Sequence, residues 1–139
     1  MAQPILPFAL PIFLCDRHVA RDRGKVDFLG AFHSIKPREY PHTHQRFSVV
    51  AHMNGGLGDI NTYVDIRNMA TGELIDTTPP RIIRFPNRNV LVRLVCEFVG
   101  VQFPSSGIYL IELYCEHTCI ADTRLRLREL DFDMSGRQE

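Results

Sequence analysis

The last third of the chain carries its clearest pattern of apolar and polar positions. Residues 109–115 are apolar almost without interruption, and apolar and polar residues alternate over 121–127. A period of two is typical of a β-strand that buries one face, whereas a continuous apolar run is typical of a strand covered on both faces. The pattern therefore predicts a β-hairpin over residues 107–130.

The same pattern predicts how the two strands of this hairpin are paired. A shift of one residue would place Ile111 opposite Asp122 and bury charge, so the apolar register is favoured. That register needs an odd-length loop centred on His117. Because Glu116 and Thr118 beside it supply no glycine for a left-handed backbone, we expect a loop of about five residues rather than three. The expected cross-strand pairs are Tyr109–Leu125, Ile111–Thr123, Leu113–Ala121 and Cys115–Cys119.

Shorter stretches of the same kind fill the rest of the chain and are separated by turn residues. Gly30 lies inside one of them and predicts a bulge or a close approach of another segment. Pro37 and Pro41 predict a loop over 36–45, since proline cannot donate to a sheet. Residues 100–107 are expected to form a second loop. The predicted strands cover residues 12–20, 26–35, 46–52, 60–67, 73–76, 81–85 and 89–99.

Two of these strands carry information about their place in a sheet. The strand over 81–85 is short and bounded by prolines, which predicts a sheet edge. The strand over 89–99 is apolar on both faces apart from Arg93 and Glu97, which predicts a central position.

Apolar positions in the predicted strands recur with a period of two, and no stretch shows the 3.6-residue period of a helix over three turns. The sequence therefore predicts an all-β fold. The sequence favours one antiparallel β-sandwich of roughly seven to eight strands, immunoglobulin-like in architecture, with a small Greek-key barrel as the alternative. The chain of 139 residues is long enough for one domain with its own core. We expect that domain over residues 1–131, followed by a polar C-terminal tail over 132–139.

Charge and cysteine content narrow the classes of function. The net charge is +0, which argues against a protein held to nucleic acid or to an anionic membrane surface by bulk electrostatics. The apolar start of the chain is interrupted by prolines and lacks the basic residues of a signal peptide, and it is too short to span a membrane. The 4 cysteines are too few for a disulfide scaffold. We therefore expect free thiols and a cytoplasmic location.

Several motifs resemble those of a known family. They are Leu14-Cys15-Asp16, Gly24-Lys25, Leu29-Gly30-Ala31-Phe32, Phe47-Ser48-Val49-Val50-Ala51 after His44, Gly55-Gly56-Leu57-Gly58, and Phe103-Pro104 before Gly107-Ile108-Tyr109. Together they resemble a family of small, uncharacterised bacterial proteins catalogued only as a domain of unknown function. The resemblance implies a β-sandwich and supplies no catalytic residues. The chain departs from the family pattern at Glu116-His117, where a glycine-containing turn is more typical.

Histidines and cysteines give two candidate metal sites. His42 and His44 would point to the same side if their segment is extended, and zinc would then need a third ligand that the sequence does not identify. At the hairpin tip, Cys115, His117 and Cys119 are the alternative, as a metal site or a disulfide. For both groups a purely structural role is the simpler interpretation, and no cofactor is expected.

Arginines form the remaining candidate site. Arg124, Arg126 and Arg128 alternate along the last strand and would line one face or edge, where they could bind an anionic partner or keep the edge from pairing. Three further arginines could extend the same patch, namely Arg81, Arg84 and Arg88. Acidic residues nearby and the absence of interleaved aromatic residues argue against nucleic acid.

The sequence contains no motif of a catalytic nucleophile, a metalloprotease or a phosphate-binding loop. We therefore expect a non-enzymatic β-sandwich that binds a protein, including a second copy of itself, as an assembly module. The alternative is a module that binds a metal or small ligand through the His42/His44 segment or the Cys115/His117/Cys119 tip.

Overall fold

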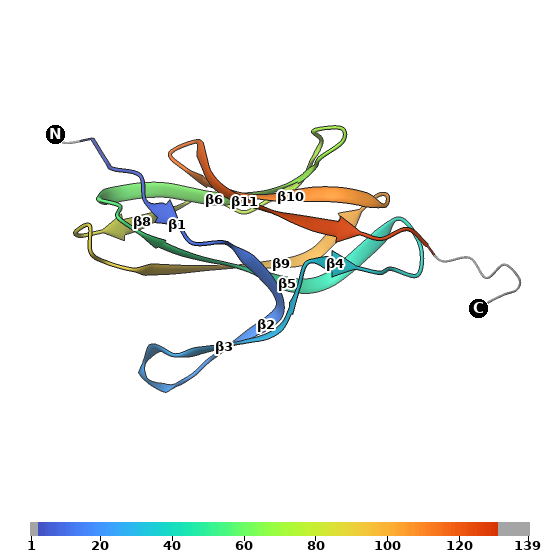
Figure 1. Ribbon diagram of the computed structural model, residues 1–139, viewed down its shortest axis with the longest axis horizontal. Coiled ribbons are helices and arrows are strands. Elements are labelled where there is room, and N and C mark those ends of the chain that lie inside the picture. Colours follow the sequence, from blue (N-terminus) through green and yellow to red (C-terminus); the bar gives the residue numbers. More distant parts are fainter. Residues whose placement is uncertain (1–2, 131–139) are drawn as a thin grey trace, which may run out of the picture.

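The computed structural model describes residues 3–130 and consists almost entirely of β-strands (Figure 1). Two sheets pack face to face, which confirms the β-sandwich. Eleven strands and one short 3-10 turn, Asp22–Gly24, make up this part of the chain. The strands are β1 (Phe8–Ala9), β2 (Phe13–Ala20), β3 (Val26–Phe32), β4 (Ser34–Ile35), β5 (His42–Asn54), β6 (Gly58–Asn68), β7 (Leu74–Thr77), β8 (Arg81–Phe85), β9 (Val92–Phe103), β10 (Gly107–Cys115) and β11 (Thr118–Leu127).

The first sheet is organised around β5, its longest strand. One edge of β5 pairs with β9 along nearly its whole length, from His42 opposite Phe103 to Met53 opposite Val92. The other edge pairs with β2 in the middle and with β1 at the end, and β3 continues the sheet beyond β2. All of these pairings are antiparallel.

The second sheet is organised around β6 and β10. Its order is β4-β11-β10-β6, and β7 and β8 share the far edge of β6. β4 runs parallel to β11, with Ser34 opposite Arg126 and Ile35 opposite Leu127. This sheet is therefore mixed rather than purely antiparallel as expected. The immunoglobulin-like arrangement stays a prediction.

The core lies between the two sheets and follows the alternation of the strands. On β6, the side chains of Ile60, Thr62, Val64 and Ile66 point inward and are at most 1% exposed. Each fully buried Leu, Ile or Phe stabilises the fold by about 1.5–3 kcal/mol relative to an exposed one. The largest fully buried side chains come from both sheets and are Tyr109, Phe47, Phe85, Phe103, Leu14, Met53, Ile60, Ile66, Ile111, Leu113, Leu125 and Leu127.

The closing hairpin has the predicted register over most of its length. Tyr109 faces Leu125, and the next two pairs also match the prediction. The fourth predicted pair, Cys115 opposite Cys119, is wrong. A bulge between Leu113 and Tyr114 shifts the register, so that Cys115 faces Thr118.

The turn of this hairpin is shorter than expected. Glu116 and His117 alone connect β10 to β11, and both have positive φ, 49° and 65°. These angles are typical of a two-residue turn whose twist matches that of the strands. The prediction of a longer loop was wrong because two non-glycine residues adopt the left-handed conformation here.

Both predicted loops are shorter than expected, because strands extend into them. β5 begins at His42, so only residues 36–41 lie outside strands, and β9 continues to Phe103. Gly100, with φ 69°, lets β9 pass the point where the predicted strand ended. β9 also lies at an edge of its sheet and not in the centre, because among the described residues only β5 pairs with it. The expected edge position of β8 is confirmed.

The predicted strand over 26–35 is divided between the two sheets. β3 belongs to the first sheet and β4 to the second, so the chain crosses from one layer to the other at His33. Gly30 has φ 71°, and a Cβ there would lie 2.3 Å from Oδ2 of Asp16. The close approach predicted at this glycine is confirmed.

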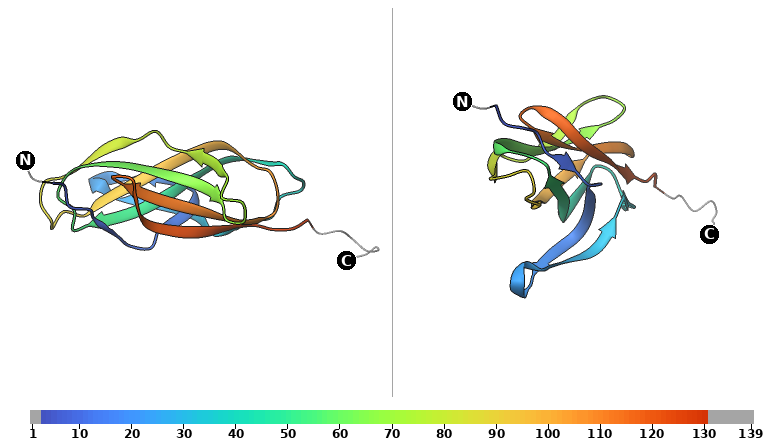
Figure 2. Two further views of the ribbon diagram at one scale, coloured as in Figure 1. Left: turned by 90° about the horizontal axis from the view of Figure 1, so that it is seen from above. Right: turned by 60° about the vertical axis from the view of Figure 1, so that its left-hand side comes forward.

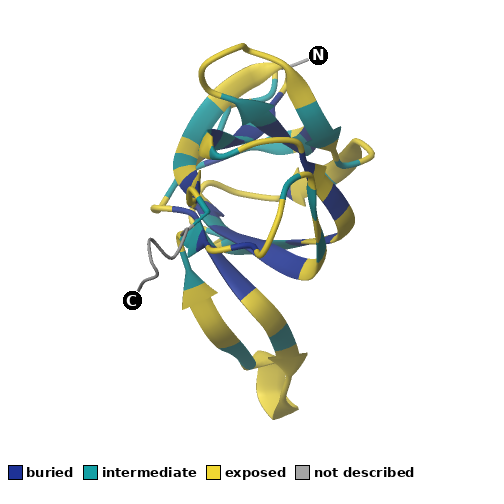
Figure 3. Ribbon diagram, turned by 90° about the vertical axis from the view of Figure 1, so that its right-hand side faces the viewer, coloured by how far each residue is buried: buried dark blue, intermediate teal, exposed yellow. Residues whose placement is uncertain are grey.

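The β2–β3 hairpin projects from the sandwich, as the right-hand view of Figure 2 shows. Much of its surface is exposed (Figure 3). Its inner side is anchored to β5: the Phe28 and His52 rings meet edge to face at 6.4 Å, and Nδ1 of His18 lies 3.0 Å from Oγ of Ser48. The single domain stays a prediction, and the predicted tail over 132–139 lies outside the described residues.

Candidate functional site

His42 and His44 lie on strand β5 and not in a loop as expected. Because the segment is extended, the two rings lie on the same side, and Nε2 of His42 is 3.1 Å from Nδ1 of His44. The His44 ring also contacts Phe32 and Phe47, with ring centroids 6.0 and 5.6 Å away. The two histidines do converge, but beside an aromatic cluster at the end of the core.

This environment disfavours the charged form of the His44 side chain. Burial and the neighbouring His42 lower the pKa of His44, because both disfavour the charged imidazolium. Within residues 3–130, no group of three or more His, Cys, Asp or Glu side chains is placed to hold a metal ion. The pair therefore lacks a third protein ligand in this part of the chain, and the metal site stays a prediction.

The side chains of Cys115, His117 and Cys119 at the hairpin tip do not come together. Cys115 is buried and its side chain faces the core, where Sγ lies 3.9 Å from Oγ1 of Thr62. Cys119 is exposed on the opposite face of the sheet, because the bulge after Leu113 places it beside Tyr114. Burial raises the pKa of the Cys115 thiol, which disfavours the thiolate that a metal would need. His117 contacts the ring of Tyr63 and neither cysteine.

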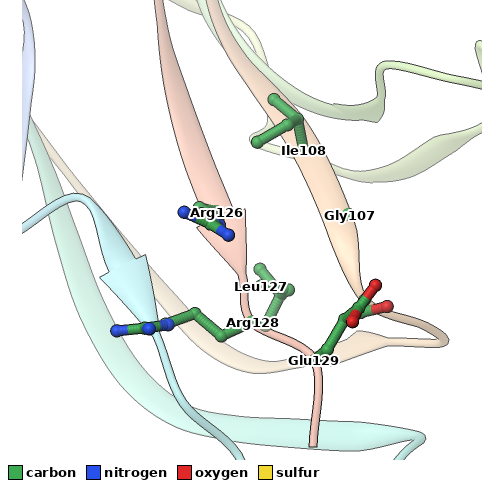
Figure 4. Close-up of a pocket in the computed structure, with 7 residues that line it drawn as sticks. Gly107, Ile108, Arg126, Leu127, Arg128 and Glu129 are labelled. Carbon is green, nitrogen blue, oxygen red and sulfur yellow. The ribbon is translucent and has the colours of Figure 1, made fainter.

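The three C-terminal arginines lie near each other at one end of the second sheet. Arg124 and Arg126 are exposed on the outer face of β11, and Arg128 follows the strand. Arg126 and Arg128 line a hollow of about 690 Å³, and Figure 4 shows Arg128 extending from the chain on the side away from Glu129. An anion-binding role for this group stays a prediction.

The other arginines do not extend this patch. β8 pairs with residues 58–62 of β6, next to the Cys115 end of β10, whereas Arg126 lies at the Gly107 end. Arg84 pairs with Asp59, and Nε of Arg88 donates to the carbonyl of Gly55. The two sets of arginines therefore lie at opposite ends of the second sheet, and a single patch is not formed.

The free edge of β9 is a feature that the sequence did not indicate. The strand spans Val92–Phe103, and its outer edge pairs with no strand of the described chain. Val99 is 61% exposed and Leu91, just before the strand, is 59% exposed. An exposed strand edge presents N–H and C=O groups that a further strand can bind.

One side chain covers the middle of this edge. Arg81 reaches from β8 across the open side of the sandwich, and its Nη2 donates to the carbonyl of Val95 at 3.2 Å. The same nitrogen lies 3.5 Å from Sγ of the buried Cys96. Arg81 thus links the edge strands of the two sheets, where no strand does so among residues 3–130.

Sequence reasoning missed this edge for a specific reason. Residues 92–98 alternate between inward apolar and outward mixed side chains, and outward Val95 and Val99 made the strand appear buried on both faces. The signal that could have indicated an edge was the pair Arg93 and Glu97, since charged side chains are one of the devices that protect edge strands.

The fold and these surfaces define a class: a β-sandwich with one open side and, among the described residues, no group of three or more potential metal ligands. The chain belongs to a family of unknown function, DUF6941, whose model matches residues 10–128. This confirms the resemblance read from the sequence. No curated protein matches the chain. Within residues 3–130 there is no helix of the length and apolar character needed to cross a membrane.

Proposed function

We propose that the protein is a non-enzymatic module that binds a protein partner by adding an extended segment of that partner to the free edge of β9. Binding of this kind is called β-augmentation: backbone hydrogen bonds supply affinity, and side chains on alternating positions supply specificity. The proposal keeps the protein-binding role expected from the sequence and assigns it to one strand.

The observation that supports it is the combination of an unpaired backbone edge with exposed apolar side chains. β9 is 12 residues long, about twice the typical length of a strand. Natural edge strands are usually short or protected by charge and proline. Val99 is 61% exposed beside this edge, so its apolar side chain is available to a bound segment.

The space beside β9 also suits an added strand. A hollow of about 440 Å³ lies between β7 and the end of β9 and is lined by residues that include Leu74 and Gln102. A second, of about 300 Å³, lies next to Arg81 and Glu97. Side chains of a bound segment that point toward the core would enter these hollows.

The expected location follows from the thiols. Cys15, Cys96, Cys115 and Cys119 are all free, which supports a reducing compartment. We propose the cytoplasm on this basis.

A site-specific photo-crosslinker tests the proposed function. It is placed at Val99 and, as a matched control, at Ile82, which is 63% exposed on the outer face of the second sheet. In cells that express the protein naturally, we expect adducts with protein from Val99 and none from Ile82. The variant Val95→Pro should abolish the adduct, because proline removes an edge-facing N–H without disturbing the pairing with β5. Val95→Ala should retain it. Equal labelling from both positions, or none from Val99, would refute the proposal.

A further inference from the structure

We infer that the partner is a second copy of this chain, with the two β9 strands pairing antiparallel about a twofold axis at Val95. This inference rests on the proposed function, since it uses the same edge. It adds the identity of the partner, the register and the residues that determine it. The first sheets of the two copies would then form one continuous sheet.

The direction of the backbone groups permits this register. In a β-strand, the N–H and C=O of one residue point to the same edge, and successive residues alternate. The Val95 carbonyl accepts from Arg81 and therefore points to the free edge. Arg93, Glu97 and Val99 share its parity, so their backbone groups point outward too, whereas those of Leu94, Cys96 and Phe98 point to β5. A twofold axis at Val95 pairs only residues of the outward set.

The side chains in this register are complementary. An antiparallel pair centred on Val95 places Arg93 opposite Glu97 of the second copy, and Leu91 opposite Val99. Each of these contacts occurs twice because of the symmetry. Opposite charges and apolar pairs directly across two strands are both stabilising. The register thus covers the two most exposed apolar side chains of this edge, Leu91 and Val99.

The charged groups lie on the outer face of the sheet, where their present contacts hold them on the β5 side. Nε of Arg93 donates to Nε2 of His52, and its Nη1 donates to the carbonyl of Gly24 at the tip of the β2–β3 hairpin, both at 3.3 Å. Its Nη2 makes no hydrogen bond within residues 3–130 and is available. Among residues 3–130, Glu97 is held only by a long, exposed contact with Arg46, 3.7 Å between Nε and Oε2. Formation of the cross-axis pairs therefore requires Arg93 and Glu97 to turn from β5 toward the free edge.

Arg81 acts against this assembly. Its guanidinium occupies the Val95 carbonyl at the position of the twofold axis, so it must leave before the second strand can pair. Removal of Arg81 should therefore strengthen self-association, by about three- to tenfold in Kd, since one competing hydrogen bond is lost. Arg84→Ala is the matched control, because Arg84 lies on the same strand but contacts Asp59 on the outer face.

Charge exchange tests the register directly by sedimentation-equilibrium ultracentrifugation of the purified chain. Arg93→Glu and Glu97→Arg should each be monomeric alone, because each places like charges opposite each other twice. An equimolar mixture of the two variants should form a heterodimer, because every cross-axis pair is then of opposite charge. The double variant Arg93→Glu/Glu97→Arg should dimerise like the wild type. Circular dichroism verifies that each variant is folded.

A wild-type chain that stays monomeric up to millimolar concentration would overturn the inference. So would a dimer that the single charge reversals do not weaken at least tenfold, or a mixture of the two variants that does not associate. The proposed function has a separate outcome. If the crosslinker at Val99 captures a different protein and Val95→Pro prevents the capture, β9 is a binding edge and only the identity of the partner is wrong.

Discussion

At the scale of single residues, Gly30 shows how close two strands can come when one lacks a side chain. Its φ of 71° is one obstacle to any other residue, and the 2.3 Å that would separate a Cβ from Oδ2 of Asp16 is another. Gly24 has nearly the same φ, 73°, but no atom within 4 Å of where its Cβ would lie. Substitution of the two glycines therefore distinguishes the cost of backbone strain, which both share, from the cost of steric contact, which only Gly30 has.

We expect Gly24→Ala to lower the free energy of unfolding by about 1 kcal/mol. Gly30→Ala should lower it by about 1 kcal/mol more than Gly24→Ala does. The additional loss comes from displacement of the Asp16 side chain. Urea denaturation followed by circular dichroism measures both. Asp16→Ala in the Gly30→Ala background should recover most of the difference. If the two glycine variants are equally stable, the contact with Asp16 has no energetic consequence.

His44 gives the fold a dependence on pH. Because its pKa is lower in the folded chain than the usual 6.5, the unfolded chain binds protons more readily, and stability is lost as the pH falls below that value. The variant His44→Leu should lose less stability than the wild type between pH 7.5 and pH ~5. Denaturation at the two pH values measures the difference. Ile82→Ala, which removes an exposed side chain without a titratable group, is the control and should depend on pH as the wild type does.

At the scale of elements, the turn of the closing hairpin stores conformational strain. Glu116 and His117 are both left-handed, although neither is glycine. Oε2 of Glu116 accepts a hydrogen bond from the backbone N–H of Asn61 at 2.6 Å, which compensates for part of this strain. Within the described chain, the His117 side chain contacts Tyr63 alone: Nδ1 lies 3.4 Å from the hydroxyl, and the two ring centroids are 6.0 Å apart.

His117→Gly should therefore stabilise the protein by about 0.5–1 kcal/mol, because it relieves the left-handed strain and loses little. Glu116→Gly relieves similar strain but removes the bond to Asn61, so we expect no net gain. Thermal unfolding of the two variants beside the wild type measures this contrast. A loss of stability in His117→Gly would show that its ring contacts with Tyr63 outweigh the strain.

The hairpin also shows what could be predicted at this scale. Alternation of apolar residues determined three of the four cross-strand pairs correctly, because a slip would bury Asp122. The bulge after Leu113 was not predictable, since either register near the tip keeps the charges in solvent. That one shift separates Cys115 from Cys119 and removes the proposed cysteine site. Likewise, alternation does not reveal that His42 belongs to a strand, because Pro41 precedes it directly.

At the scale of the whole molecule, the crossing from β3 to β4 connects the two sheets. Ile35 is 8% exposed and pairs, on the short parallel strand β4, with Leu127. Ile35→Ala should lower the free energy of unfolding by about 2–4 kcal/mol, as expected for a large side chain removed from a core. Ile82→Ala, at a 63% exposed position, should change it by less than about 0.5 kcal/mol. Urea denaturation tests both. Similar values would mean that β4 contributes little to the packing.

The arrangement of strands in sheets was beyond what the sequence could provide. Burial patterns predict which face of a strand is covered, but β9 shows that they do not predict which edge is paired. The edge of β9 is covered in its middle by the side chain of Arg81, which is 14 residues away in sequence from Val95. Such a contact depends on how β8 and β9 meet across the two sheets and leaves no local pattern.

The parallel pairing of β4 with β11 has a consequence for how the protein is made. Residues 34–35 emerge from the ribosome long before residues 126–127, yet each needs the other to complete the second sheet. β6 is likewise synthesised well before β10, the strand with which it pairs. The nascent chain therefore holds apolar strands without partners until most of it has been translated, which is the state that general chaperones bind. Folding of this protein is expected to be largely post-translational.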